Sequence, residues 1–252
     1  MRIVLGIPSL LWKLYIAVIF GVTAIFYYPI IVPFLFSDNK KKKAFRIFVV
    51  WSWTVRVFCF YLVKKKKSST LPDGPYIIVA NHASYLDIFL LYSIMSKEPF
   101  LFLGKSEILR YPLLKTYFKR MNIPVHRSSA IKSARSLVAA AKESKKGWSL
   151  VIFPEGGIPD VNNPKMIPFK EGAFQLAKSL KVPIIPMTFT NNHKLFSDPT
   201  QLFGPARPGV SHVYIHPFIS AEEVERMSQK ELKDKCFAVV NEPLLDCYPN
   251  LK

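Results

Sequence analysis

Two apolar segments dominate the beginning of the chain. Residues 14–36 carry no charged side chain, and residues 47–63 are apolar and rich in aromatic residues apart from Arg56. A helix of about 20 apolar residues is long enough to cross a bilayer. Pro29 and Pro33 are expected to kink or end the first helix toward its far end. The pattern predicts an N-terminal membrane anchor made of two apolar helices.

Lysine tetrads at residues 40–43 and 64–67 frame the second apolar segment, and residues 40–67 contain no Asp or Glu. Because basic flanks stay on the cytoplasmic side, both ends of this segment belong on one side, and we expect it to lie in the membrane interface. The first segment then either spans once or forms half of a shallow hairpin. The tetrads are expected to attract an anionic membrane surface, with the active domain on the cytoplasmic face.

A cleaved signal peptide followed by a basic linker is the other explanation of this N-terminal pattern. It is disfavoured, because the apolar stretch is too long and no clear A-x-A site follows it.

Strand-like and helix-like patterns alternate after a turn cluster at residues 71–75. The expected strands are residues 76–80, 100–103, 123–126, 149–153, 183–189 and 212–215, and the expected helices are residues 84–96, 106–120, 130–146, 171–181 and 221–237. Such alternation predicts an α/β fold with a mostly parallel sheet flanked by helices. We therefore expect membrane-associating helices with basic flanks over residues 1–70 and one α/β domain over residues 71–252.

The composition narrows the possible partners. The 252 residues include 35 Lys and Arg against 17 Asp and Glu, and 35 − 17 gives a formal net charge of +18. Half of the residues are hydrophobic, which excludes a disordered chain. The basic excess predicts anionic partners, and because it flanks apolar runs we expect a membrane surface and no nucleic acid. The three cysteines and the histidines show no metal-ligand spacing, so we expect no metal and no cofactor.

The first chemical motif follows the predicted strand at residues 76–80. His82 and Asp87 are five residues apart, which separates them by about 140° on a helix. They can meet only if His82 lies in the turn and Asp87 in the first helical turn, and Ser84 as N-cap gives that placement. Asp87 could then accept from one imidazole nitrogen and leave the other as a general base. The alternative is that Asp87 only completes a capping box and His82 is an ordinary turn residue.

Three further groups follow the ends of predicted strands. Glu155 with Gly156 suits a ligand that approaches backbone N–H groups, although a solvated glutamate in a turn is the alternative. Arg127 suits bidentate binding of phosphate, although a single surface arginine is common. Lys105 is a weak signal by itself. The chain has no G-x-S-x-G motif, which favours a base that acts directly on a bound hydroxyl over an acyl-enzyme.

Taken in order, these segments resemble the glycerolipid acyltransferase family of the 1-acylglycerol-3-phosphate acyltransferase (PlsC) type. The resemblance covers about residues 71–220, and the basic, apolar N-terminus also matches. The matched motifs are N-H-x-x-x-x-D at Asn81, His82 and Asp87, K-x-E at Lys105 and Glu107, a strand ending in arginine at Ile123, Val125 and Arg127, F-P-E-G at residues 153–156, F-K-x-G at Phe169, Lys170 and Gly172, and V-P-I-I-P at residues 182–186.

The resemblance implies a membrane-associated O-acyltransferase. Such an enzyme moves a fatty acyl group from acyl-CoA or acyl carrier protein to the free hydroxyl of a lysolipid, here 1-acylglycerol-3-phosphate to give phosphatidic acid. It implies that His82 removes the proton from the hydroxyl and that Asp87 orients the imidazole. Backbone N–H groups near Gly156 would steady the developing oxyanion.

The resemblance also implies an acceptor site. Glu155 would shape this site, and Arg127 with Lys105 would hold an acceptor phosphate. The chain departs from the family at Ile158, where an arginine that helps to bind the phosphate is expected. Lys165, in the same loop, is the candidate substitute.

Three other hypotheses about the function stay open. Asn122 and Gly157 stand where the family has glycine and threonine, and Ile158 would suit a non-phosphate acceptor such as a lyso-aminolipid. A non-catalytic lipid-binding protein of the same fold would also tolerate these departures, but the intact His82 and Asp87 argue against it. A membrane-attached nucleic-acid binder rests on charge alone.

Overall fold

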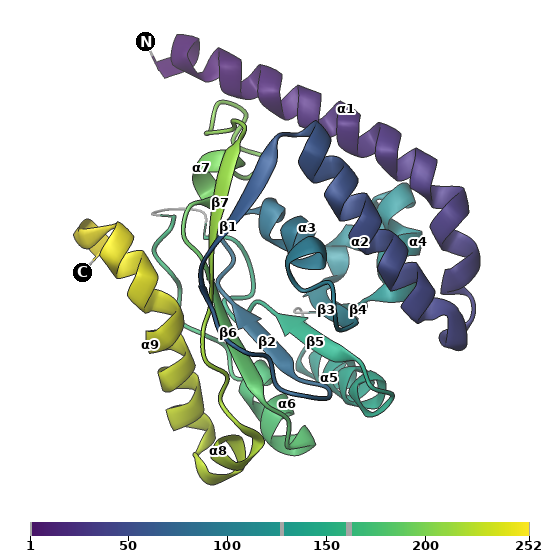
Figure 1. Cartoon of the computed structure of the whole chain (residues 1–252), viewed down its shortest axis with the longest axis vertical. Helices are drawn as coiled ribbons and strands as arrows, with labels where there is room; N and C mark the ends of the chain where they lie inside the picture. The colour runs from purple at the N-terminus through teal and green to yellow at the C-terminus, as the bar shows by residue number, and fades with distance from the viewer. Residues whose placement is uncertain (1, 127–128, 160–162, 252) are drawn as a thin grey trace.

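A seven-stranded sheet forms the centre of the molecule (Figure 1). The computed structural model describes residues 2–126, 129–159 and 163–251. The strand order is β1-β7-β6-β2-β5-β3-β4, and every neighbouring pair is parallel except β6 with β7. The strands are β1 (Tyr61–Ser68), β2 (Ile77–Ala80), β3 (Phe100–Lys105), β4 (Ile123–Val125), β5 (Ser149–Ile152), β6 (Ile184–Phe189) and β7 (Gly209–Ile215). The expected α/β fold with a mostly parallel sheet is confirmed.

Helices cover both faces of the sheet. Figure 1 shows α9 on one side of the sheet and α2 with α3 on the other. The helices are α1 (Arg2–Leu35), α2 (Lys41–Phe58), α3 (Tyr85–Ile94), α4 (Pro112–Met121), α5 (Ala130–Lys145), α6 (Gly172–Leu180), α7 (Asn192–Leu195), α8 (Ala221–Arg226) and α9 (Gln229–Cys247). Short 3₁₀ turns add η1 (Asp38–Lys40), η2 (Ser106–Arg110) and η3 (Pro249–Leu251).

The central strands position the site. Every residue of β2, β5 and β6 is buried, because a parallel sheet covered on both faces needs continuous apolar strands. Ile77 of β2 pairs with Leu150 of β5 and with Ile184 of β6, so the three strands end at the same edge. The segments that follow these strands therefore meet at one end of the sheet, where ligands bind in folds of this kind.

Strand β1 corrects the expectation of a helix that continues to residue 63. Helix α2 ends at Phe58, and Phe60 turns the chain with a φ of +51°. The second lysine tetrad, residues 64–67, therefore lies on an edge strand and does not flank a membrane helix. Lysines on an edge strand discourage pairing with another chain, which gives the tetrad a structural role. The division of the chain at residue 71 stays a prediction, although β1 brings residues 61–68 into the sheet.

A second difference concerns residues 221–237, which were expected to form one helix. Two helices occur, because Ser228 leaves the helical conformation and caps α9. The Ser228 side chain accepts from the N–H of Glu231, and the Glu231 carboxylate accepts from the N–H of Ser228, which completes a capping box.

The two N-terminal helices differ in how they pack. Helix α2 buries Phe45, Phe48 and Trp51 against the domain. Helix α1 fully buries few of its described apolar side chains, and the segment Gly6–Leu35 is long and apolar enough to cross a membrane. The following side chains of α1 are more than half exposed: Leu11, Leu14, Val18, Val22, Ile25 and Phe26.

Candidate active site

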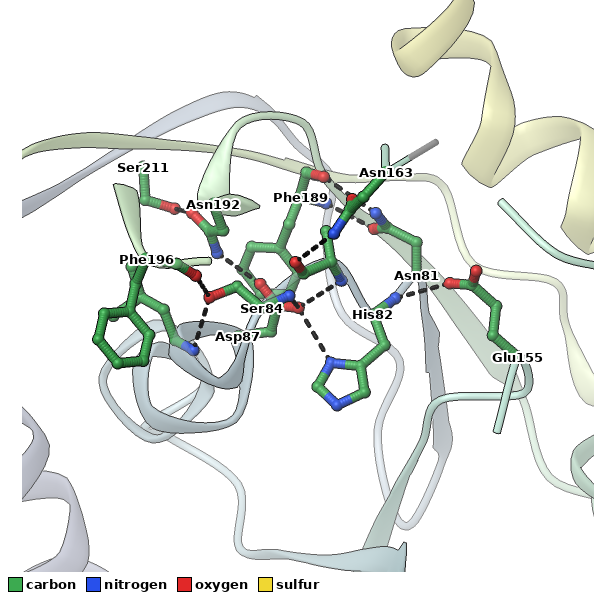
Figure 2. Close-up of polar contacts among 12 residues, drawn as sticks. Asn81, His82, Ser84, Asp87, Glu155, Asn163, Phe189, Asn192, Phe196 and Ser211 are labelled. Carbon is green, nitrogen blue, oxygen red and sulfur yellow. Dashed lines mark hydrogen bonds and ion pairs between the residues drawn. The ribbon is translucent and has the colours of Figure 1, made fainter. Parts of the chain in front are cut away.

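The turn after β2 brings His82 and Asp87 together (Figure 2). Asn81 fixes this turn to the end of β6, because its side chain donates to the carbonyl of Phe189 at 3.0 Å and accepts from its N–H at 2.8 Å. The imidazole Nδ1 of His82 lies 3.1 Å from Oδ2 of Asp87. When Nδ1 donates its proton to that carboxylate, Nε2 is left unprotonated and able to act as a base.

Asp87 has two roles that the sequence presented as alternatives. Its side chain is fully buried, and Oδ2 also accepts from the N–H groups of Ala83 at 2.8 Å and Ser84 at 2.9 Å. Ser84 completes the capping box by accepting from the N–H of Leu86 at 3.0 Å. The helix cap therefore holds the carboxylate that orients His82, and capping and orientation depend on the same atom.

Asn192 holds the other oxygen of this carboxylate, which sequence reasoning did not foresee. Its Nδ2 donates to Oδ1 of Asp87 at 2.7 Å, and its Oδ1 accepts from the hydroxyl of Ser211 at 2.6 Å. Figure 2 shows the three side chains in this order. Asn192 is 105 residues from Asp87 along the chain, so no local spacing could have signalled the contact.

Phe153 holds the plane of the imidazole. Its ring is stacked on His82 with a centroid distance of 4.1 Å and an interplanar angle of 18°. The strand β5 ends one residue before Phe153, so the aromatic side chain reaches the turn after the neighbouring strand β2. The stacking restricts rotation of His82 while Asp87 fixes its hydrogen bond.

The side chain of Glu155 is buried and hydrogen-bonded to the backbone, so it is not a solvated turn residue. Its Oε1 accepts from the N–H of His82 at 2.7 Å, and its Oε2 accepts from the N–H of Ile167 at 3.0 Å. Burial raises the pKa of Glu155 to about 7, against the opposite effect of the two backbone hydrogen bonds, and the charge of Asp87 acts in the same direction as burial. Glu155 therefore joins the turn at His82 to the loop that follows β5.

Gly156 is required by its backbone conformation. Its φ is +84°, and a Cβ atom there would lie 2.7 Å from Nζ of Lys170. The N–H of Gly156 donates to the carbonyl of Phe153 at 3.0 Å, so this N–H has a partner within the protein. The N–H of Lys170 donates to the carbonyl of Pro154 at 2.9 Å, and the lysine side chain lies directly beside Gly156.

The structure describes only some of the basic residues that were expected to bind the acceptor phosphate. Lys105 ends β3, is 58% exposed and lies 3.6 Å from the carboxylate of Glu107. Lys165 is exposed in the loop between β5 and α6. Arg127 lies outside the described residues. Lys170, to which the sequence assigned only a motif match, is exposed beside Gly156.

Within the described part of the chain, no group of three or more His, Cys, Asp and Glu residues could hold a metal ion. The contact between Nδ1 of His82 and the buried carboxylate of Asp87 supports the chemistry of a general base. A histidine oriented by a buried carboxylate at the end of a parallel sheet can activate a hydroxyl group for acyl transfer.

Comparison with known proteins agrees with acyl transfer as the class of reaction. The chain belongs to the acyltransferase family, whose family model matches residues 62–190. A chloroplastic 1-acyl-sn-glycerol-3-phosphate acyltransferase of Brassica napus is 29% identical over 73% of this chain and 53% of its own length. A putative enzyme of the same name from Caenorhabditis elegans is 32% identical over 66% of this chain and 61% of its own length.

A third curated relative and a solved structure are also similar to this chain. The 1-acyl-sn-glycerol-3-phosphate acyltransferase of Saccharomyces cerevisiae is 31% identical over 70% of this chain and 61% of its own length. The chain thus spans between about half and two thirds of the length of these curated relatives. The crystal structure of the acyltransferase PlsC from Thermotoga maritima covers 98% of both chains with a TM-score of 0.79 at 23% identity, which shows the shared fold.

Proposed function

We propose that this chain transfers a fatty acyl group from an acyl thioester to the free hydroxyl of 1-acylglycerol-3-phosphate and so forms phosphatidic acid. The observation that carries the proposal is the contact between Nδ1 of His82 and the buried carboxylate of Asp87, which leaves Nε2 as a base. The relatives named above carry this activity in their names, which supports the choice of acceptor. Acyl-CoA and acyl carrier protein are the two donors that fit the basic charge of the chain.

The reaction requires one base and no covalent enzyme intermediate. Nε2 of His82 takes the proton of the acceptor hydroxyl as its oxygen forms a bond to the thioester carbon. The imidazolium that results is stabilised by Asp87 at 3.1 Å. When the tetrahedral intermediate collapses, the carbon–sulfur bond breaks and the thiolate takes the proton back from His82, which regenerates the base.

The acceptor phosphate needs a cation in place of the arginine that Ile158 replaces. Lys170 is a candidate that geometry supports, because its ammonium lies beside the glycine that follows Glu155. Lys105 lies at the same edge of the sheet, since β3 pairs with β5 and ends beside it. A lyso-aminolipid acceptor is the second candidate function, and the observation that favours it is the isoleucine itself.

A panel of acceptors tests this assignment. In Lys170→Gln, the KM for 1-acylglycerol-3-phosphate is expected to rise about tenfold, because a hydrogen bond to a charged group is lost. Lys165→Gln is measured in parallel, because Lys165 is another exposed lysine of this loop and the competing candidate for the phosphate. Products are measured by mass spectrometry with lysophosphatidic acid and lyso-aminolipids as acceptors. A KM increase confined to Lys165→Gln assigns the phosphate to Lys165, and a diacylated aminolipid as sole product contradicts the phosphate acceptor.

We also propose that the exposed apolar face of α1 lies in the membrane. A lysolipid acceptor resides there, so the face places the site close to its substrate. The lysines at residues 40–43 lie at the turn into α2, and their charge supports the cytoplasmic side for the α/β domain.

Vesicle flotation tests the membrane face. Val18→Lys combined with Val22→Lys is expected to lower binding to anionic vesicles more than 100-fold, since each lysine costs about 3 kcal/mol in the bilayer core. Val138→Lys is the control, because Val138 is comparably exposed but lies on α5. Equal binding of the double variant and the control would contradict membrane contact through this face of α1.

A further inference from the structure

The carboxylate of Asp87 is held at both oxygens, and the two oxygens have different partners. Oδ2 accepts from Nδ1 of His82 and from the N–H groups of Ala83 and Ser84, all within the same turn. Oδ1 accepts from Nδ2 of Asn192 at 2.7 Å. The first set of contacts is local, whereas the second reaches the carboxylate from α7, which follows β6.

Ser211 fixes the orientation of the Asn192 amide from the side opposite Asp87. Ser211 of β7 donates its hydroxyl proton to Oδ1 of Asn192 at 2.6 Å, so Nδ2 must face Asp87. Asn192 and Ser211 are both fully buried, so water does not compete for these hydrogen bonds. An amide fixed in this way offers the carboxylate a donor and never an acceptor.

We propose that Asn192 is a positioning residue for the catalytic base: its amide, held by Ser211, fixes the rotation of the Asp87 carboxylate so that Oδ2 faces His82. The inference rests on the proposed function, because it concerns the same base. Asn192 acts through Asp87 and His82. Its effect is therefore expected in the rate of the chemical step and not in substrate binding.

The neighbouring residue Asn191 provides a matched control. Like that of Asn192, its side chain makes two hydrogen bonds, but both go to β7: it donates to the carbonyl of Val210 at 2.8 Å and accepts from the N–H of His212 at 2.8 Å. Neither of these contacts involves Asp87. If the amides of this turn served only to attach it to β7, loss of either amide would have the same consequence.

The first measurement compares Asn192→Ala with Asn191→Ala at saturating acceptor and donor. Asn192→Ala is expected to lower kcat about 10- to 100-fold with little change in KM, the effect of losing a hydrogen bond to a charged group. Ser211→Ala is expected to lower kcat in the same direction by a smaller factor, because the amide is then free to turn. Asn191→Ala is expected to keep the kcat of the wild type.

The second measurement is the pH profile of kcat/KM for Asn192→Asp, which preserves the shape of the side chain. Two carboxyl groups in contact cannot both ionise easily, so at low pH the introduced group donates its proton to Asp87 as the amide does. As the pH rises it ionises, and the added negative charge keeps the imidazole protonated and inactive. The acidic limb of the profile is therefore expected to move upward by at least one pH unit.

Other titratable groups near Asp87 must be considered in this profile. Besides His82, the charge of Asp87 acts on Glu155 and on His193, and burial lowers the pKa of His193 to about 4. Both groups are unchanged in Asn192→Asp, so the shift is measured against the wild type. Asn191→Asp adds the same charge to the same turn and is expected to move the limb much less.

The outcomes separate this inference from the proposed function. If the wild type forms product while Asn192→Ala and Asn191→Ala lower kcat and the melting temperature equally, the positioning role is overturned and the proposed function stands. An unshifted acidic limb in Asn192→Asp also overturns it, even if Asn192→Ala does not fold. If the wild type forms no product and His82→Ala behaves identically, the proposed function itself fails.

Discussion

Replacement of His82 by alanine is expected to lower kcat by about 10²–10⁴-fold, the usual contribution of a general base. In the proposed mechanism the imidazole takes the proton of the acceptor hydroxyl, and Asp87 at 3.1 Å and the stacked ring of Phe153 hold it in place. The melting temperature is also expected to fall, because the buried imidazole stacks on Phe153 and is hydrogen-bonded to Asp87 of α3. Steady-state kinetics with labelled acyl-CoA measures the effect.

The control for this variant is His212→Ala. His212 lies on β7 beside the lysines of β1, and its imidazole has no part in the proposed mechanism. Burial and the nearby charges of Lys66 and Lys64 lower the pKa of His212. A His82→Ala enzyme with the turnover of the wild type would show that the base lies elsewhere.

Replacement of Asp87 by asparagine is expected to lower kcat by about 10³–10⁴-fold and to destabilise the fold. The amide cannot satisfy its surroundings, because Oδ2 receives the N–H groups of Ala83 and Ser84 while Oδ1 faces the amide of Asn192. One donor must then face another donor, which costs about 1–3 kcal/mol for a buried group. The loss of the negative charge also removes the support of the imidazolium.

A second capping box separates the two effects of this variant. Glu231 caps α9 as Asp87 caps α3, by accepting from the N–H of Ser228 at 2.8 Å. Glu231→Gln is expected to lower the melting temperature slightly and to leave kcat unchanged. If Asp87→Asn lost stability but kept its turnover, Asp87 would be a helix cap and nothing more.

The parts of the site that the sequence could predict are those within a few residues of a strand end. His82, Ser84 and Asp87 occupy one turn, so their spacing predicted the cap and allowed the contact, with an ordinary turn histidine as the alternative. Glu155 and Gly156 follow a strand that pairs with β2, and the parallel sheet brings them beside His82. The burial of Glu155 and its two backbone hydrogen bonds depend on the folded loop, which no local pattern encodes.

The contacts that the sequence could not predict join distant segments. Asn192 contacts Asp87, and Ser211 contacts Asn192, because β6, α7 and β7 return to the same end of the sheet. Short polar residues of this kind are common in any turn. Lys170 lies beside Gly156 because the loop between β5 and α6 folds back, with the N–H of Lys170 donating to the carbonyl of Pro154. Asn192 and Ser211 belong to no spacing rule, and only the assembled sheet identifies them.

The fold was predictable where apolar runs were continuous and not where charge interrupted them. The buried strands β2, β5 and β6 and the long apolar helix α1 all correspond to uninterrupted apolar segments. Strand β1 was missed because only its first three residues are apolar and four lysines follow. An edge strand tolerates such a sequence, since it is covered on fewer sides than a central strand.

The central claim is that the acyl group passes directly from the thioester to a lipid hydroxyl activated by His82. The most direct test mixes the full chain with isotope-labelled acyl-CoA, with and without lysophosphatidic acid, and analyses lipid and intact protein by mass spectrometry. We expect labelled phosphatidic acid from the wild type, at least 100-fold less from His82→Ala, and no label bound to the protein. Labelled protein formed without acceptor, or equal amounts of phosphatidic acid from both proteins, would contradict this claim.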